Sequence, residues 1–453
     1  MSKIETINPY TNHLIKRYTV YSSEKIEYII NSAYRTFTTW KDVNLERRIQ
    51  LIDNITTLLS QNLNTYAQLI TDEMGKPISE SKAEIKKCML LCDYYKTNTG
   101  HLLADKWVKT EAHESFIKYD PLGVVLGIMP WNYPFWQVMR FAIPTLTSGN
   151  TILLKHASNV TGSALILQDI FEKAQYPKGC FQTIISNHNA IENIIKNDHV
   201  KAVSLTGSEK AGKIIASLAG KHLKKSVLEL GGNNPCIVLK DANLDKYIEI
   251  MVRSRMQNTG QSCIAAKRFI VVGSIYDEFL KLFTAKIKEL TPGNPSSDSV
   301  DIGVLARPDL ADSLENQVTH SIEKGATVHF GNHRKANYYQ PTILTNVKPG
   351  MPVFDEETFG PIASIMKVKD KNEAYKMAAT SKFGLGCMIF TKDIEDAKNH
   401  ISTIEDGSFF INELVKSDPR LPFGGTKASG YGRELSKEGL LEFVNIKTVY
   451  INT

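Results

Sequence analysis

The regular alternation of short apolar runs with amphipathic segments restricts the fold of this chain more than any other feature. Between the runs lie segments such as 163–173 and 210–223, whose apolar residues recur with the period of a helix. Strand, crossover helix and strand at this spacing predict a parallel sheet in a doubly wound, Rossmann-like α/β domain. The runs are GVVLGIM (123–129), TILLK (151–155), FQTII (181–185), AVSLTG (202–207) and SVLELGG (226–232).

A second set of apolar runs predicts another α/β domain, and a chain of 453 residues exceeds what one hydrophobic core holds. Before both sets, short strands to about residue 20 precede long helical patterns to about residue 100. Residues 103–120 alternate loosely, as in a hairpin, and a strand at 446–451 closes the chain. The second set comprises CIVL (236–239), FIVVG (269–273), ATVHFG (326–331), ASIMKV (363–368) and CMIF (387–390).

Composition excludes several classes of protein. The net charge of +6 is spread without a Lys/Arg block, which favours anionic small molecules over nucleic acid. Prolines interrupt the most apolar stretch, 121–146, so we expect a buried segment and no membrane span. Six cysteines with neither zinc spacing nor disulfide density predict no metal site and a reducing compartment. The N-terminus lacks a targeting pattern, so we expect a cytoplasmic protein.

Cys263, in NTGQSCIAAKRF (258–269), is a candidate nucleophile. It follows a polar loop containing glycine and precedes an apolar run, with Lys267 and Arg268 close behind. Nearby cations favour a thiolate, which is the reactive form of cysteine. The alternative is a buried structural cysteine, the commoner fate of this residue.

Three other stretches carry groups that could take part in catalysis or ligand binding. Glu229 places a carboxylate inside an apolar strand, which implies either a hidden ion pair or a base with a raised pKa. Asn132 lies in PWNYP (130–134), which is either a rigid turn or a fixed N–H donor for an oxyanion. Gly207 and Ser208 end a strand and open a helix, where free N–H groups favour a phosphate.

These motifs occur in an order that resembles the NAD(P)-dependent aldehyde dehydrogenase superfamily over essentially the whole chain. The flanking sequences look most like the short bacterial succinate semialdehyde dehydrogenases. The motifs that carry the resemblance are PWNYP, LLK (153–155), LTGS (205–208), LELGGNNP (228–235), NTGQSC (258–263), EETFGP (356–361) and PFGG (422–425).

The resemblance implies a domain division. A cofactor-binding domain would comprise 1–102 and 122–230, and a catalytic domain 231–430. A small β oligomerisation element, 103–121 and 431–453, would join subunits into a homodimer or homotetramer.

The resemblance also implies roles for single residues. Cys263 would attack the aldehyde carbon, and Asn132 with the Cys263 backbone N–H would form the oxyanion hole. Glu229 would activate water to hydrolyse the thioester, so that oxidation to the acid is irreversible. The remaining matches concern NADP or NAD: Trp131 and Phe359 as aromatic walls, Lys155 and Glu357 as ribose contacts, and Gly207 and Ser208 as the pyrophosphate helix.

Two positions bear on cofactor and substrate choice. Family members strict for NAD commonly carry Glu where this chain has Ser158, so we expect NADP to be accepted. Arg140 would hold the distal carboxylate of succinate semialdehyde, or else form an ion pair beneath the sheet. Better-known members place a second arginine where this chain has Gln257, and Arg420 is a candidate substitute.

Other functions compete with this reading. The chain could oxidise another small aliphatic or aromatic aldehyde. It could be a cysteine esterase that uses Cys263 and Glu229 without a nucleotide. It could also be a structural protein that kept the fold and lost the activity, although Cys263, Asn132 and Glu229 occurring together disfavour that.

Overall fold

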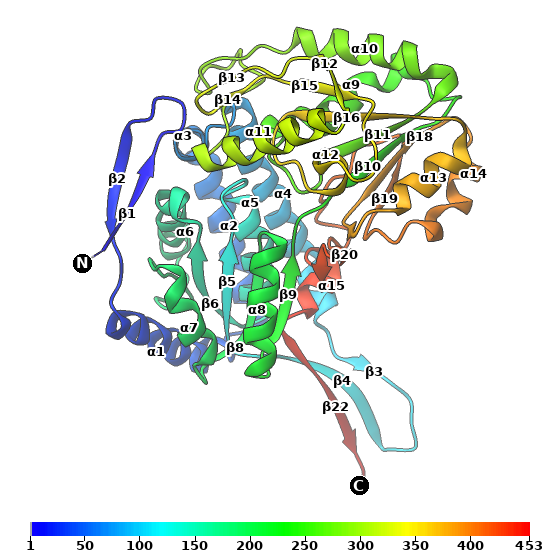
Figure 1. Cartoon of the computed structure of the whole chain (residues 1–453). Coiled ribbons are helices and arrows are strands. Elements are labelled where there is room, and N and C mark those ends of the chain that lie inside the picture. Colours follow the sequence, from blue (N-terminus) through cyan, green and yellow to red (C-terminus); the bar gives the residue numbers. More distant parts are fainter. Residues whose placement is uncertain (1) are drawn as a thin grey trace.

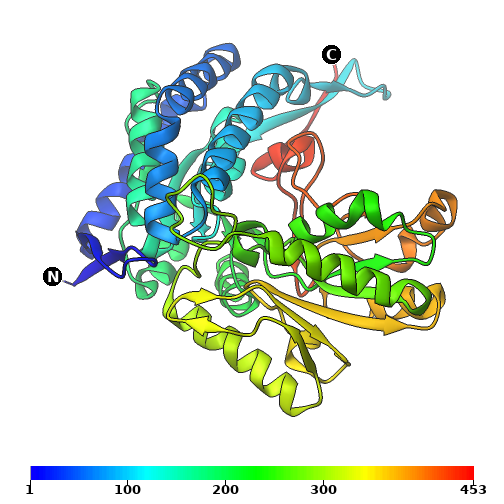
Figure 2. The same cartoon turned by 90° about the horizontal axis from the view of Figure 1, so that it is seen from above.

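Two parallel sheets and their helices form the two lobes of the computed structural model, which describes residues 2–453 (Figures 1 and 2). The chain opens with an antiparallel pair of strands and then a layer of four helices, as the patterns predict. These elements are β1 (Lys3–Ile7), β2 (Leu14–Thr19), α1 (Ser23–Trp40), α2 (Leu45–Gln61), α3 (Leu63–Met74) and α4 (Ile78–Leu102).

The first sheet has six strands in the order β21-β9-β8-β5-β6-β7. Apart from the short antiparallel β21, all neighbouring strands are parallel. The chain starts at central β5, proceeds to one edge, and returns to β8 on the other side, which creates a topological switch point. The elements are β5 (Val124–Met129), α5 (Trp136–Thr147), β6 (Thr151–His156), α6 (Thr161–Lys173), β7 (Phe181–Thr183), α7 (Ile191–Lys196), β8 (Val200–Thr206), α8 (Glu209–Lys221), β9 (Lys225–Glu229) and β21 (Gly430–Tyr431).

The second sheet has seven strands in the order β12-β15-β16-β11-β10-β18-β19, parallel except for β12. Both sheets confirm the predicted doubly wound α/β class. The elements are β10 (Asn234–Val238), α9 (Leu244–Met256), β11 (Ala266–Val272), α10 (Tyr276–Glu289), α11 (Pro308–Glu323), β12 (Thr327–Phe330), β15 (Thr342–Thr345), α12 (Pro352–Asp355), β16 (Ile362–Val368), α13 (Lys371–Ala379), β18 (Cys387–Phe390), α14 (Ile394–Asn399) and β19 (Phe409–Ile411).

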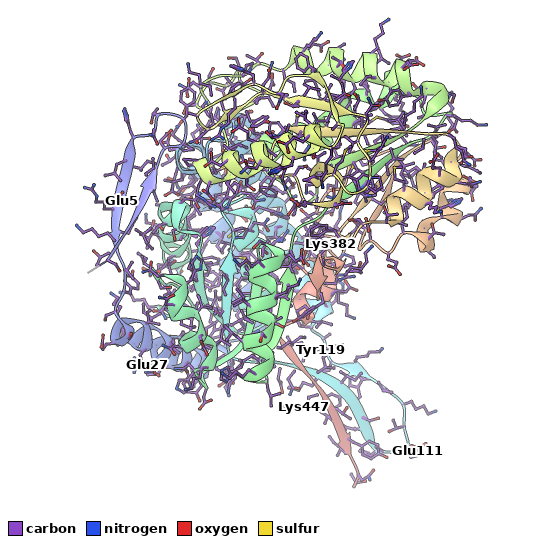
Figure 3. The ribbon with its side chains drawn as sticks, viewed as in Figure 1. Glu5, Glu27, Glu111, Tyr119, Lys382 and Lys447 are labelled. Atoms are coloured by element: carbon purple, nitrogen blue, oxygen red, sulfur yellow. The ribbon has the colours of Figure 1, made fainter. Side chains whose placement is uncertain are left out.

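A three-stranded antiparallel arm projects from the first lobe (Figure 1). It pairs β3 (Lys106–Trp107) and β22 (Val444–Ile451) with β4 (Glu114–Pro121), and α15 (Ser436–Leu441) leads into it. Lys447 on β22 forms an ion pair with Asp120 on β4, and Glu111 lies near the tip of the arm (Figure 3). Two further short pairs are β13 (Arg334–Lys335) with β14 (Tyr338–Tyr339), and β17 (Phe383–Gly384) with β20 (Thr426–Lys427).

The apolar stretch 121–146 lies inside the first lobe. Every residue of α5 is buried, because this helix packs between the sheet and the layer formed by α2 and α4. Within residues 2–453, no helix combines the length and apolar character that crossing a membrane requires.

Candidate active site

The predicted site residues gather where the carboxyl edge of the first sheet meets the amino edge of the second. Asn132 follows β5, and Glu229 is the last residue of β9. Cys263 and Glu357 come instead from segments that lead into β11 and β16 of the second sheet. Contacts cross between the two groups: the Asn132 side-chain amide donates to the Gln261 carbonyl oxygen at 3.1 Å.

A strained backbone presents Cys263. Asn258, Thr259 and Gly260 have successive φ angles of 57°, 53° and 72°. For a β-branched threonine this left-handed conformation costs about 1–3 kcal/mol, so other contacts must hold it. The Asn258 backbone N–H donates to a Glu80 carboxylate oxygen at 2.7 Å, and the Thr259 hydroxyl oxygen accepts from the backbone N–H of Gly303 at 3.1 Å.

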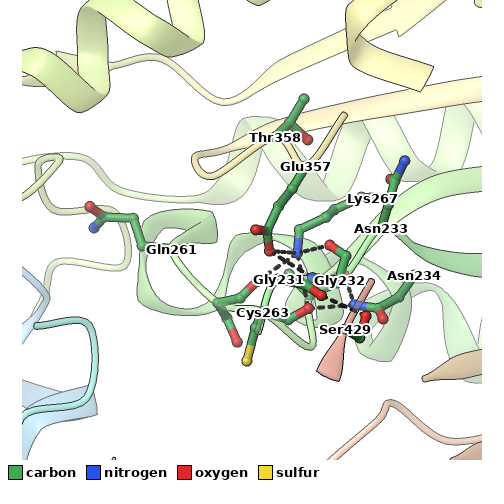
Figure 4. Close-up of polar contacts among 12 residues, drawn as sticks. Gly231, Gly232, Asn233, Asn234, Gln261, Cys263, Lys267, Glu357, Thr358 and Ser429 are labelled. Atoms are coloured by element: carbon green, nitrogen blue, oxygen red, sulfur yellow. Dashed lines mark hydrogen bonds and ion pairs between the residues drawn. The ribbon is translucent and has the colours of Figure 1, made fainter. Parts of the chain in front are cut away.

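Burial dominates the acidity of the Cys263 thiol. It raises the pKa to about 11, although the charges of Arg140 and Lys267 act in the opposite direction. The expectation that nearby cations stabilise the thiolate therefore needs correction. The sulfur points away from the Lys267 ammonium group (Figure 4), and the buried Arg268 donates to the backbone oxygens of Asn233 and Ala378. For Cys263 to act as a nucleophile, its thiol would first have to lose its proton.

Lys267 instead ties three segments of the site together (Figure 4). Its buried Nζ donates to the carbonyl oxygens of Gly232, Ser262 and Cys263 at 2.5, 3.0 and 3.0 Å. It also contacts a Glu357 carboxylate oxygen at 2.8 Å, and the same oxygen accepts from the Gly232 backbone N–H at 3.0 Å. The segment of the nucleophile, the turn after β9 and Glu357 are thus fixed relative to one another.

The side-chain amide of Asn132 keeps an unused hydrogen-bond donor. Its side-chain nitrogen uses one hydrogen for the Gln261 carbonyl oxygen, which leaves the second available, and its buried Oδ1 has no hydrogen-bond partner among residues 2–453. The Asn132 backbone oxygen accepts from Lys76 Nζ at 3.2 Å and from Asn258 Nδ2 at 2.9 Å. Within the same range the Cys263 backbone N–H donates to no other residue. Both proposed oxyanion donors are therefore free.

A buried ion pair supports Asn132 from behind, and the sequence reasoning missed it. Lys76 pairs with Glu84, whose other carboxylate oxygen accepts from the backbone N–H groups of Phe135 and Trp136 at 2.8 and 2.9 Å, at the start of α5. A signal for Glu84 was present. It falls on the inward face of α4, at helical spacing from buried Cys88.

Glu229 is a buried carboxylate without partners. It is 2% exposed, and neither carboxylate oxygen has a hydrogen bond among residues 2–453. Burial first, and then the charge of Glu434, raise its pKa well above the ordinary value, while Arg140 and Arg433 oppose the rise. Glu229 thus forms no ion pair within residues 2–453 and its pKa is raised, while its role as a base stays a prediction.

Cys263 lies on the wall of a cavity of about 450 Å³. Glu229 is not on that wall, but its charge raises the pKa of the Cys263 thiol, so the two groups interact electrostatically. Arg140, Gln257 and Phe423 are on it. The wall also carries aromatic and polar side chains from α4, α5 and the loop after β19, among them Lys87, Trp136, Ser417 and Asp418.

Of the two alternatives for Arg140, the ion pair is formed, and the role of holding a substrate carboxylate stays a prediction. It lines the cavity, and it also forms a buried ion pair with Glu434, a partner that the sequence reasoning missed. Its Nη2 donates to the Thr206 hydroxyl oxygen at 3.3 Å, and its guanidinium lies 4.8 Å from the Phe423 ring centroid. A substrate carboxylate would therefore meet a cation whose charge is already offset.

Arg420 does not reach the cavity. Its side chain is 76% exposed and binds both carboxylate oxygens of Asp418, at 2.8 and 2.7 Å. The structure thus does not bring it into the place of the arginine that is absent at Gln257.

The predicted cofactor residues lie at the carboxyl ends of the first sheet. Lys155, near the end of β6, is 4% exposed and forms no ion pair within residues 2–453; burial lowers its pKa. A buried cation without an acid partner suits a bound anion. Ser208 caps α8 after Gly207, its hydroxyl oxygen accepting from the Ala211 N–H at 3.3 Å, and Ser158 is exposed just after β6.

Two aromatic rings form a corner near Glu357. Trp131 and Phe359 pack edge to face, with ring centroids 5.7 Å apart. The buried Arg255 fixes the segment of Phe359 by donating to the Ile362 and Thr358 carbonyl oxygens at 2.6 and 3.1 Å. Anion-binding groups and an aromatic corner at a topological switch point fit a dinucleotide such as NAD(P). In residues 2–453 no cluster of His, Cys, Asp and Glu is arranged to hold a metal ion.

Comparisons with known proteins identify the family of the chain. The model of the aldehyde dehydrogenase family matches residues 1–449. A probable succinate-semialdehyde dehydrogenase [NADP(+)] of Synechocystis sp. is 45% identical over 451 residues, 99% of each chain. The succinate-semialdehyde dehydrogenase [NADP(+)] 1 of Mycobacterium tuberculosis is 41% identical over 454 residues, again 99% of each chain.

A solved structure has nearly the same fold as this chain. The succinic semialdehyde dehydrogenase of Streptococcus pyogenes, in complex with NADP+, superposes with a TM-score of 0.97 at 33% identity, over 99% of this chain and 100% of that one. The resemblance drawn from the motifs is thereby confirmed, and the chain belongs to the aldehyde dehydrogenase family.

Proposed function

We propose that this aldehyde dehydrogenase oxidises succinate semialdehyde to succinate, with NADP+ or NAD+ as the oxidant. The observation that carries the proposal is that Cys263 shares one cavity with the cationic side chains of Arg140 and Lys87. Lys87 forms no ion pair within residues 2–453, and such a cation suits an aldehyde with an acid at its far end. Relatives that match almost the whole chain are named succinate-semialdehyde dehydrogenases, which supports this substrate.

Each step of the proposed reaction uses groups of the candidate site. The Cys263 thiol first releases its proton to solvent, and the sulfur then attacks the aldehyde carbon. The Asn132 amide with the Cys263 backbone N–H stabilises the resulting alkoxide; losing one such donor typically costs on the order of 10²–10³ in rate. NADP+ or NAD+, when bound, supplies the hydride acceptor that converts the thiohemiacetal into a thioester. Glu229, with its raised pKa, then takes a proton from the water that releases the acid.

We propose further that Ser158 permits NADP+. Its short neutral side chain does not repel a phosphate on the adenosine ribose, whereas a glutamate there would. Lys155, buried and without an acid partner in residues 2–453, would pair with that phosphate. The bound NADP+ of the Streptococcus pyogenes relative supports this preference.

Initial rates on an aldehyde panel test the proposal. Succinate semialdehyde, butanal and benzaldehyde are compared, each with NADP+ and with NAD+. We expect the highest kcat/KM for succinate semialdehyde with NADP+. A higher kcat/KM for butanal or benzaldehyde would indicate a dehydrogenase for another aldehyde. Ester hydrolysis without nucleotide, and no oxidation of any aldehyde, would indicate an esterase.

We also propose that the arm joins subunits into a homodimer or homotetramer. Its outer strand β22 leaves one edge unpaired, and Ile446, Tyr450 and Trp107 are exposed. An unpaired edge with apolar side chains suits a second copy of the same sheet. Light scattering on the full chain and on an Ile446→Lys, Tyr450→Lys variant tests this; a wild-type monomer contradicts it.

A further inference from the structure

A lysine on the wall of the Cys263 cavity has no acidic partner. Lys87 lies on α4, almost one turn after Glu84. Its Nζ donates to the Ser417 hydroxyl oxygen at 2.7 Å and lies 4.1 Å from the Trp136 ring centroid. Lys87, Ser417 and Trp136 all line the cavity that contains Cys263. This cation therefore faces the space into which an aldehyde must enter.

The acids around Lys87 are already committed elsewhere. Glu84 pairs with Lys76, and Asp418 binds Arg420 through both carboxylate oxygens. Within residues 2–453, Lys87 itself forms no ion pair. The wall carries two further acids: Glu80 accepts from the Asn258 N–H, and Glu413 pairs with Lys416. Of its other cations, Arg140 pairs with Glu434, and Arg253 is exposed.

The charge of Lys87 is held at a cost. Burial, together with the neighbouring charge of Arg140, lowers its pKa to about 8. Lys87 is half-buried and has no counter-ion within residues 2–453, so an arriving anion stabilises its ammonium group and a neutral ligand does not. Arg140 differs, because Glu434 already offsets its charge. Lys87 is thus the better site for a carboxylate on this wall.

We propose that Lys87 binds the distal carboxylate of the substrate and so determines the preference for an aldehyde that carries an acid. This assignment rests on the proposed oxidation of succinate semialdehyde. The donors suffice for one carboxylate. Lys87 keeps two N–H groups after donating to Ser417, and Ser417, whose oxygen accepts from Lys87, keeps its O–H to donate. The ring of Trp136 holds the ammonium group in place by a cation–π contact.

The experiment compares Lys87→Met and Lys87→Arg with Lys86→Met. The last is a matched control, because Lys86 is an exposed neighbour whose replacement removes the same charge. The measured quantity is the ratio of kcat/KM for succinate semialdehyde to kcat/KM for butanal. Loss of a charge-assisted contact should lower this ratio on the order of 10- to 100-fold in Lys87→Met, mainly through KM for the acid. Lys87→Arg should restore most of it, and Lys86→Met should match the wild type.

The pH dependence of the same kcat/KM ratio is a second test, because a purely structural role of Lys87 would not change it. Lys87 is charged below its pKa of about 8 and neutral above it. The acid-to-butanal ratio of the wild type should therefore fall as pH rises through about 8. In Lys87→Arg the fall should disappear, because arginine stays protonated.

The possible failures are distinguishable. A wild type that prefers the acid, with the same preference in Lys87→Met, overturns the role of Lys87 and leaves the proposed function standing. A wild type without that preference contradicts the proposed function. Calorimetric titration with succinate, which needs no turnover, then decides on Lys87: equal affinity of the wild type and Lys87→Met overturns the proposal, and weaker binding by Lys87→Met supports it.

Discussion

Removing the charge of Lys76 and removing the charge of Glu84, which form a buried ion pair, should lower the unfolding free energy by different amounts. Both side chains are almost fully buried, at 0% and 1% exposure, so solvent screening does not reduce the effect. After Lys76→Met, the Glu84 carboxylate keeps the N–H groups of Phe135 and Trp136 at the start of α5. After Glu84→Gln, the Lys76 ammonium group keeps the Asn132 carbonyl oxygen, the face of the Tyr133 ring and the more distant charge of Glu80, but no directly contacting carboxylate.

The magnitudes follow from these remaining contacts. Breaking one side of a buried pair costs about 3–5 kcal/mol in unfolding free energy. The N-terminus of α5 can stabilise a carboxylate that has lost its counter-ion by up to about 2 kcal/mol. We therefore expect Glu84→Gln to cost about 5 kcal/mol and Lys76→Met about 3 kcal/mol. The double variant should cost clearly less than their sum, because it leaves no unpaired charge.

Urea unfolding of the wild type, both single variants and the double variant measures these costs. Lys398→Met is the control, since its exposed pair with Glu395 should contribute at most about 1 kcal/mol. Lys76→Met also removes one of two donors to the Asn132 backbone, so kcat should fall about tenfold. Equal costs for the two single variants, or strict additivity in the double one, would refute the reasoning.

Replacing Glu229 with Gln should leave a burst of about one equivalent of reduced cofactor while steady turnover collapses, because the thioester would no longer be hydrolysed; full steady-state activity would remove the assignment. Ser158→Glu should raise KM for NADP+ far more than for NAD+ through charge repulsion, and equal effects would contradict the role of Ser158. Burial raises the pKa of Glu73 from 4.5 to about 7, so the folded state binds more protons in that interval and stability falls as pH rises through it. Glu73→Gln should flatten this slope in urea unfolding between about pH 5 and pH 8, and an unchanged slope would show that another group causes it.

The sequence predicted the sheets well because strands of parallel sheets are buried on both faces. Their residues therefore appear as uninterrupted apolar runs, and the run at 123–129 became β5 and the run at 363–368 became most of β16. The same local logic placed Ser208 at the start of a helix. It also placed Cys263 between a polar turn and a buried strand.

What the sequence could not show are partners distant along the chain and the effect of burial. The partner of Arg140 is Glu434, and no spacing connects the two. Arg420 pairs with Asp418, two residues away, and this short spacing could have suggested the contact. The acidity of Cys263 depends on how far water is excluded, so the cations next to it in sequence gave the wrong sign.

The order of synthesis gives the projecting arm a further consequence. Residues 114–121 leave the ribosome early, but β4 has its full-length partner only in residues 444–451. Until those residues have been made, one long strand edge stays open while the rest of the protein folds around it. The newborn chain is therefore exposed to wrong pairing throughout the synthesis of residues 122–443, and chaperone contact should concentrate on 114–121.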